Sequence, residues 1–174
     1  MEFNNQQVDS GLLPKIEDLQ YHSLENDYKT LLIVLLSIIN FILVSVFVVL
    51  CLIESFDLAQ TILGIIGVLL FIRIIWSYIA AVKRFQYKSY ALREKDIVYR
   101  SGWLWRQTVV VPFNRVQHVQ IDQGPLERRF DLARLKIFTA GGNSSDINIP
   151  GLRPDRAQKI KQFIVSKTAM DEEE

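Results

Sequence analysis

An uncharged apolar run of 23 residues at positions 31–53 constrains this chain more than any other feature. An α-helix rises about 1.5 Å per residue, so a helix over this run is about 34 Å long and can cross the roughly 30 Å hydrocarbon core of a bilayer. The run follows a polar leader and is longer than the apolar stretch of a typical signal peptide. We therefore expect a transmembrane helix that is retained.

A second apolar run, at positions 58–82, carries one charge, Arg73. Its length also fits a membrane span. Arg73 either belongs to an ion or substrate pathway, or it snorkels towards the headgroups or pairs the two helices. We favour the second interpretation, because two spans alone are too few to enclose a pore.

The flanking charges predict the orientation of the two spans. The link at positions 54–57 has no Lys or Arg, whereas Lys29 precedes the first span and Lys83, Arg84 and Lys88 follow the second. Cytoplasmic loops are enriched in basic residues, so both termini should be cytoplasmic. The only cysteine, Cys51, lies inside the first span, so we expect no intramolecular disulfide and no redox chemistry.

Positive charge is concentrated in the second half of the chain. Residues 83–168 contain 17 Lys or Arg and seven Asp or Glu, an excess of ten positive charges, while residues 1–29 and the last four residues are acidic. A basic domain beside an anionic leaflet is attracted to it by roughly 1 kcal/mol per basic residue near the surface. Nucleic acid is a rival anion, but the membrane tether makes lipid the nearer one.

Short strands dominate the sequence after the spans. Alternating patterns predict strands at residues 87–93, 97–101, 107–111, 116–122, 134–139 and 145–149. Pro112 and the residues Gly141, Gly142 and Asn143 mark ends and turns. Pro154 then begins a helix with an apolar face. The pattern predicts an antiparallel barrel or sandwich closed by one amphipathic helix.

The polar residues form no catalytic or metal-binding constellation. His22 and His118 are the only histidines, and we interpret His118 as a polar strand residue. Asn143 begins a glycosylation-type triplet, which we interpret as turn chemistry on the cytoplasmic side. Trp103 and Trp105 are expected to share a strand face, either packed in the core or exposed as an interfacial anchor.

Several short motifs carry a resemblance to a known family: VPFNRVQ at 111–117, GPL at 124–126, RRF at 128–130, LA at 132–133 and TAGG at 139–142. With the two spans before them, they resemble the YdbS-like bacterial pleckstrin-homology (PH) family of membrane proteins. The resemblance implies a PH-like barrel of two roughly orthogonal sheets, capped by the final helix, in the bacterial cytoplasmic (inner) membrane. It implies no enzyme activity and leaves the ligand open.

The segment after Gly124 and Pro125 is interpreted mainly as architecture. Leu126 and Phe130 are expected to plug one end of the barrel, leaving the Arg128 and Arg129 pair to face solvent, membrane or a partner. Asp131 stands where the resembling pattern places glycine. Because Asp tolerates the left-handed region, we expect a positive φ at this position.

The predicted fold class is a membrane-anchored all-β protein with helices. Its expected parts are a polar cytoplasmic arm at 1–30, transmembrane helices at 31–53 and 58–82, a bacterial PH-like domain at 87–168 and an acidic tail at 169–174.

The predicted function is that of a non-enzymatic module with a basic cytoplasmic surface. Its partners would be envelope proteins, including another membrane PH-like protein or a second copy, or anionic lipid headgroups. Proteins are slightly favoured, because a tethered domain gains little localisation from lipid. The alternative is an accessory subunit of a transport or channel assembly acting through Arg73. We expect no cofactor, metal, nucleic acid or small-molecule substrate. The candidate contact residues are Lys83, Arg84, Trp103, Trp105, Arg106, Arg128 and Arg129.

Overall fold

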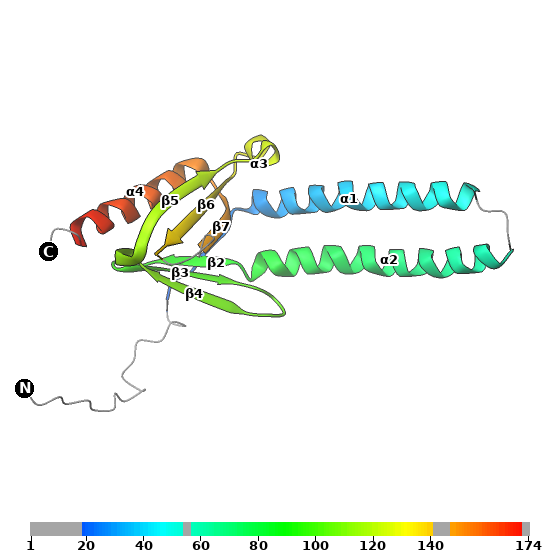
Figure 1. The fold of residues 1–174 in the computed structure, drawn as a ribbon, viewed down its shortest axis with the longest axis horizontal. Helices are drawn as coiled ribbons and strands as arrows, with labels where there is room; N and C mark the ends of the chain where they lie inside the picture. The colour runs from blue at the N-terminus through cyan, green and yellow to red at the C-terminus, as the bar shows by residue number, and fades with distance from the viewer. Residues whose placement is uncertain (1–18, 54–56, 141–146, 172–174) are drawn as a thin grey trace, which may run out of the picture.

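Two long helices project side by side from one end of a small β domain (Figure 1). This arrangement comes from a computed structural model that describes residues 19–53, 57–140 and 147–171. The helices are α1 (Asn26–Ile53) and α2 (Asp57–Gln86), and both are long and apolar enough to cross a bilayer. The described part of the chain therefore has the predicted class, a membrane-anchored β protein with helices.

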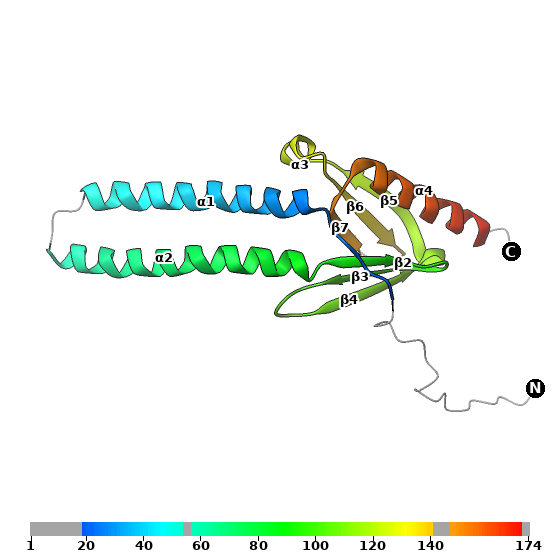
Figure 2. The same cartoon turned by 180° about the vertical axis from the view of Figure 1, so that it is seen from behind.

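The segment before the first span belongs to the β domain. Strand β1 (His22–Ser23) pairs with β2, and α1 begins at Asn26, five residues before the expected start of the span. Leu24, Tyr28 and Leu31 are buried in the core of the domain. From behind, Figure 2 shows this segment running along the first sheet before it enters α1. The end of the expected polar arm thus contributes both a strand and core side chains.

Two antiparallel sheets form the domain. One has the order β1-β2-β3-β4 and the other β5-β6-β7. The bounds are β2 (Ser89–Leu92), β3 (Asp96–Ser101), β4 (Gln107–Pro112), β5 (Val116–Asp122), β6 (Ala133–Thr139) and β7 (Ile147–Leu152). A short 3-10 helix, η3 (Phe113–Arg115), leads from the first sheet to the second. The register of β5 against β6 shifts between Val116 and His118, which marks a bulge or irregularity in this strand. The turn expected at residues 141–143 lies outside the described residues.

Helix α4 (Pro154–Asp171) covers the second sheet, as Figure 1 shows. It begins at Pro154, as expected, and buries Ala157, Ile160 and Ile164 at helical spacing. The ring of Phe163 packs edge-on against Phe113 of η3, with 5.9 Å between ring centroids. The predicted closing helix is therefore confirmed, and its apolar face completes the core.

The turn between α3 (Pro125–Arg129) and β6 contains the one positive φ among the described non-glycine residues, at Asp131 (φ 51°). This confirms the expectation for that position. The Asp131 carboxylate also accepts a hydrogen bond from Arg153 at 3.1 Å, and Arg153 bonds Asp27 in the first turn of α1 at the same distance. The turn is therefore connected to the base of the first membrane helix.

The expected role of Leu126 is wrong, because this side chain is 40% exposed. Phe130 does pack, partly buried, against the core. The buried residue of α3 is Glu127, whose Oε2 accepts the Gly124 backbone N–H at 2.9 Å while Oε1 accepts Nη2 of Arg134 at 2.7 Å. Glu127 is thus the buried residue of this short helix, and its carboxylate also binds the backbone N–H at the start of the first turn.

Polar side chains connect the two long helices. The hydroxyls of Ser37 and Tyr78 lie 2.9 Å apart, and Asn40 Nδ2 lies 3.4 Å from Ser77 Oγ. Nη1 of Arg73 donates to Oδ1 of Asn40 at 2.8 Å. Of the roles weighed for Arg73, the structure shows helix pairing.

Candidate functional site

The expected contact residues fall into two groups at the end of the domain from which the helices emerge. Lys83 and Arg84 lie in the last turn of α2, and Trp103, Trp105 and Arg106 lie in the β3–β4 hairpin beside that turn. The pair Arg128 and Arg129 lies in α3, on the other side of the helix pair, near the start of α1 (Figure 1). The structure brings the first group together and leaves the arginine pair apart from it.

The tip of the β3–β4 hairpin is a tight loop rather than a strand. Gly102 has φ +94°, and a Cβ at this position would lie 1.7 Å from the Trp105 carbonyl oxygen. This close backbone approach requires glycine. The expected shared strand face of Trp103 and Trp105 is therefore wrong, because the chain turns between Ser101 and Gln107.

The two tryptophans of this loop have different environments. The Trp103 ring packs against Trp76 of α2, with 5.9 Å between ring centroids. Trp105 is 86% exposed, and Leu104 between them is 65% exposed. Both alternatives weighed for the tryptophans are thus present, one ring packed and one ring exposed.

The contact with Trp76 places the loop at membrane level. Trp76 precedes Lys83 by seven residues, so it lies about 10 Å further along α2 towards the bilayer. Tryptophan is enriched where the hydrocarbon core meets the headgroups. The loop is therefore at the depth where an exposed apolar tip can enter the interfacial region.

A pocket of about 480 Å³ lies between the end of α2 and the hairpin. Among the described residues, its polar lining consists of two guanidinium groups, four hydroxyls and two amides: Arg100, Arg106, Tyr87, Ser89, Ser101, Thr108, Gln86 and Gln107. Guanidinium groups bind phosphate oxygens with paired N–H donors. The lining therefore suits an anion.

Aromatic rings hold both arginines of the pocket. The Arg106 guanidinium lies over the ring of Tyr87, 5.3 Å from its centroid. That of Arg100 lies over Tyr21, at 4.1 Å. Stacking on a ring orients a guanidinium. The expected contact residues did not include Arg100, Tyr21 or Tyr87, because the contacts that bring them together join distant segments.

Lys88 lies at the junction of the helices and the domain. Its Nζ donates to the Tyr28 hydroxyl at 3.3 Å and lies 5.4 Å from the centroid of that ring. Burial, together with the positive charges of Arg84 and Arg134, lowers the pKa of Lys88. The base of the helix pair is thus an electropositive region.

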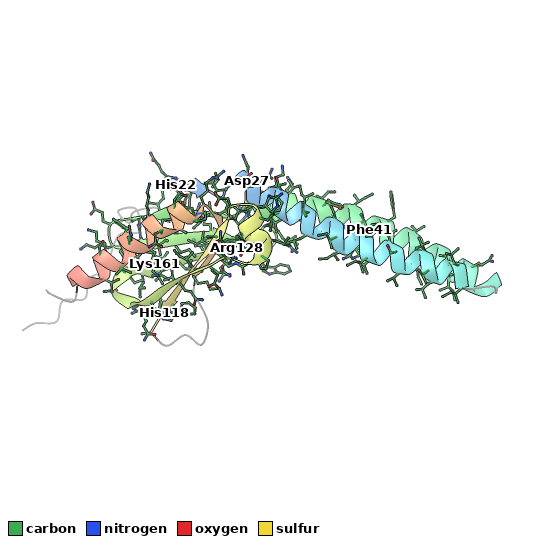
Figure 3. All side chains as sticks on the ribbon, turned by 90° about the horizontal axis from the view of Figure 1, so that it is seen from above. His22, Asp27, Phe41, His118, Arg128 and Lys161 are labelled. Carbon is green, nitrogen blue, oxygen red and sulfur yellow. The ribbon has the colours of Figure 1, made fainter. Side chains whose placement is uncertain are left out.

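Other candidate residues do not contribute to this site. His118 is exposed and stacks on Phe138, with 4.1 Å between ring centroids. Figure 3 shows His118 at the edge of the domain. His22 lies in β1 beside Tyr90. Within the described residues, no group of three or more His, Cys, Asp or Glu side chains could hold a metal ion. The glycosylation-type triplet at Asn143 lies outside the described residues.

Comparison with known proteins agrees with this architecture. The family model described as "Bacterial PH domain" matches residues 30–168. The chain is 35% identical over 102 residues to the UPF0699 transmembrane protein YdbS of Bacillus subtilis (strain 168). That match covers 58% of this chain and 62% of the relative, which is less than two thirds of its length. No solved structure matches the chain. The two apolar helices, the pair of antiparallel sheets and the family match together identify this chain as a membrane protein of the bacterial PH domain family.

Proposed function

We propose that this protein is a non-enzymatic, membrane-anchored PH-like module that binds the phosphate headgroups of anionic lipids in the leaflet next to its domain. The pocket between α2 and the β3–β4 hairpin is the observation that carries this proposal. Its lining combines the guanidinium groups of Arg100 and Arg106 with hydroxyl and amide groups. Phosphate diesters match this donor set.

The position of the pocket favours a lipid over a soluble anion. The hairpin that forms one wall also places Trp103 against Trp76 of the membrane helix. A headgroup in the adjacent leaflet therefore needs only to move laterally to reach the pocket. The basic residues Lys83 and Arg84, exposed in the last turn of α2, raise the local concentration of anionic lipid.

Lipid binding here would orient the domain rather than localise it. The two helices already anchor the chain, so a headgroup contact at the hairpin gives the domain a fixed angle to the membrane. Both termini would lie in the cytoplasm of a bacterial cell, because the basic flanks are on the side of the domain. A domain held at a fixed angle can present its remaining surface to protein partners.

The test uses the full-length protein and native mass spectrometry of lipids that remain bound after purification. Wild-type protein should retain phosphatidylglycerol in preference to phosphatidylcholine. The double variant Arg100→Gln with Arg106→Gln should retain about tenfold less phosphatidylglycerol, because two charge-assisted hydrogen-bonding groups are lost.

Two matched double variants remove the same charge elsewhere. Lys159→Gln with Lys161→Gln changes α4, far from the pocket, and should keep wild-type retention. Arg128→Gln with Arg129→Gln tests the pair on α3 that sequence analysis put forward. If all three double variants lose phosphatidylglycerol equally, lipid retention depends on the general positive charge of the domain and not on the pocket. Equal retention of both lipids by the wild type would refute the proposed function itself.

A further inference from the structure

The tip of the β3–β4 hairpin exposes two large apolar side chains. Leu104 and Trp105 follow each other in the chain, and most of the surface of each side chain is exposed. Tight turns are usually built from Gly, Pro, Asn, Asp and Ser. Adjacent large apolar side chains at an exposed tip therefore indicate a surface that contacts something other than water.

The length of α2 fixes where the hydrocarbon core ends on the side of the domain. This helix begins at Asp57, beside the link between the two spans, and Trp76 lies nineteen residues further along. The rise over these residues is about 28 Å, close to the roughly 30 Å thickness of a hydrocarbon core. With Asp57 at the far boundary of the core, Trp76 therefore lies at the boundary next to the domain.

Helix α1 gives the same boundary. It ends at Ile53, and the same length counted back along the helix reaches about residue 34. Leu31 is buried in the core of the domain, and Leu32 and Leu35 pack against that core. The part of α1 up to about Leu35 therefore contacts the domain, and the part that contacts lipid follows it.

Side chains with interfacial preferences gather at this level. Trp76 and Tyr78 lie here on α2, and Tyr78 Oη lies 2.9 Å from Ser37 Oγ of α1. Tryptophan and tyrosine are enriched at the level of the headgroups. Arg73 lies less than one helical turn from Trp76, so its guanidinium is within snorkelling reach of the headgroups. The types of these side chains agree with the boundary given by the helix lengths.

The hairpin meets the helix pair at this boundary. The Trp103 ring packs against Trp76, which is itself 57% exposed on the surface of α2. Figures 1 and 2 show the hairpin reaching past the end of α2, alongside the helix. The lipid-facing surface of α2 is therefore continuous, through the two tryptophans, with Leu104 and Trp105.

We propose that Leu104 and Trp105 enter the interfacial layer of the leaflet next to the domain, as an apolar membrane contact beside the two helices. A tryptophan ring at this level buries its apolar body while its indole N–H stays among the headgroups. The tip thus holds the domain to the bilayer at a point away from the helix axes. This contact needs no anionic lipid, so it goes beyond the headgroup pocket proposed above.

The experiment measures the depth of Trp105 in full-length protein reconstituted into phosphatidylcholine vesicles. Trp76→Phe with Trp103→Phe leaves Trp105 as the only tryptophan and keeps an aromatic ring at both contact positions. The quenchers are acrylamide in water and phosphatidylcholine brominated either near the headgroup end or near the terminus of its acyl chain. Phosphatidylcholine carries no net charge, so a failure in this assay would leave the proposed anionic-lipid function untouched.

Bromine near the headgroup end should remove about half of the Trp105 fluorescence, and bromine near the chain terminus should remove less, because indole rings prefer the interface. The matched control combines Trp76→Phe, Trp103→Phe and Trp105→Phe with Val165→Trp. Val165 is 51% exposed in the C-terminal half of α4, whose end lies away from the helices in Figure 1. The control tryptophan should respond to acrylamide and not to brominated lipid.

A second measurement keeps the contact between Trp76 and Trp103 intact. In the otherwise unchanged chain, Trp105→Ala should lower the fluorescence that brominated lipid quenches by about one third, because three tryptophans contribute at this level. An unchanged quenched signal in this variant would contradict the contact.

Three results of the depth measurement would overturn the proposal. Quenching of Trp105 by acrylamide as strong as in the control, without quenching by brominated lipid, would place the tip in water. Protection from both quenchers would place the tip against protein. Stronger quenching by bromine near the chain terminus than near the headgroup end would place it inside the hydrocarbon core.

Discussion

The β domain and the helix pair place polar and apolar side chains in opposite positions. In the domain, Leu135 and Ile137 are completely buried between the two sheets. In the helix pair, Phe41 is 74% exposed and Leu52 is 80% exposed, while Asn40 is buried at the interface. Figure 3 shows side chains projecting along the whole helix pair, with Phe41 among them.

The difference follows from the two solvents. Water drives apolar side chains of the domain into a shared core. Lipid tails are as apolar as leucine, so the membrane helices gain nothing by burying apolar side chains against each other. Polar contacts such as Ser37 with Tyr78 then have an important role in aligning the helices. The energetic consequences of one substitution should therefore differ between the two regions.

The largest contrast is expected for leucine truncation. Leu135→Ala should lower the free energy of unfolding of the domain by about 2–5 kcal/mol, because it leaves a cavity in a packed core. The same change at Leu52, which faces lipid, should cost on the order of 0.5 kcal/mol. Thermal unfolding of both full-length variants in detergent, followed by near-ultraviolet circular dichroism, measures the difference. Similar losses would mean that Leu52 contacts protein.

Two glycines give the next contrast. Gly151 has φ +67°, and a Cβ there would lie 2.4 Å from Cγ of Tyr28. Gly151→Ala should destabilise the docking of α1 on β7 by about 2 kcal/mol or more. Gly64 in α2 has no atom within 4 Å of such a Cβ, so Gly64→Ala should be neutral or stabilise by up to about 1 kcal/mol. The same unfolding assay applies, and tolerance of Ala at residue 151 would contradict the packing of Tyr28 against this turn.

A smaller effect is expected from Asn40→Leu. This variant should weaken helix pairing by about 0.6–1.7 kcal/mol, because it removes the partner of both Arg73 and Ser77. Hydrogen–deuterium exchange should rise in the middle of α1 and α2 and stay unchanged in β5 and β6. Ile39→Leu, at a neighbouring exposed position, is the matched control. Faster exchange throughout the domain would show that the two regions are not energetically separate.

The smallest effect should come from a pair of residues that faces water. A hydrogen bond from Lys136, with a second from Gln120, holds the pKa of the Asp122 carboxyl below its usual range. The stability that this pair contributes is therefore present at neutral pH and is lost as the pH falls through the lowered pKa. Because both partners are partly exposed, Asp122→Asn should cost less than about 1 kcal/mol at pH 7.

Unfolding measured at pH 7 and at pH 3 checks this contribution. The difference between wild type and Asp122→Asn should be smaller at pH 3 than at pH 7, and it should also shrink in high salt. A difference that persists unchanged at pH 3 would assign the effect to packing rather than to charge.

Much of this architecture could be predicted from local sequence. The two spans follow from uncharged runs long enough to cross a bilayer, and the strands follow from short alternating stretches. The positive φ at Asp131 followed from the resemblance to the PH family, which places glycine at that position. The basic and aromatic residues near the end of α2 were put forward from their types alone, because such residues are common at membrane interfaces.

The tertiary structure alone decided which of these residues meet. It places Trp76 against Trp103, Tyr28 against Gly151 and Arg73 against Asn40. It also forms the pocket from the end of α2 and three strands of the first sheet, β2, β3 and β4.

The sequence by itself determined the spans, the strands and the closing helix, because hydrophobic length and periodicity are properties of contiguous residues. Only the tertiary structure decided that the segment before the first span completes the domain, that the hairpin reaches the membrane helix, and that Arg73 pairs with Asn40 across the two helices. Those features depend on contacts between segments far apart in the chain, and periodicity within one segment does not specify its distant partner.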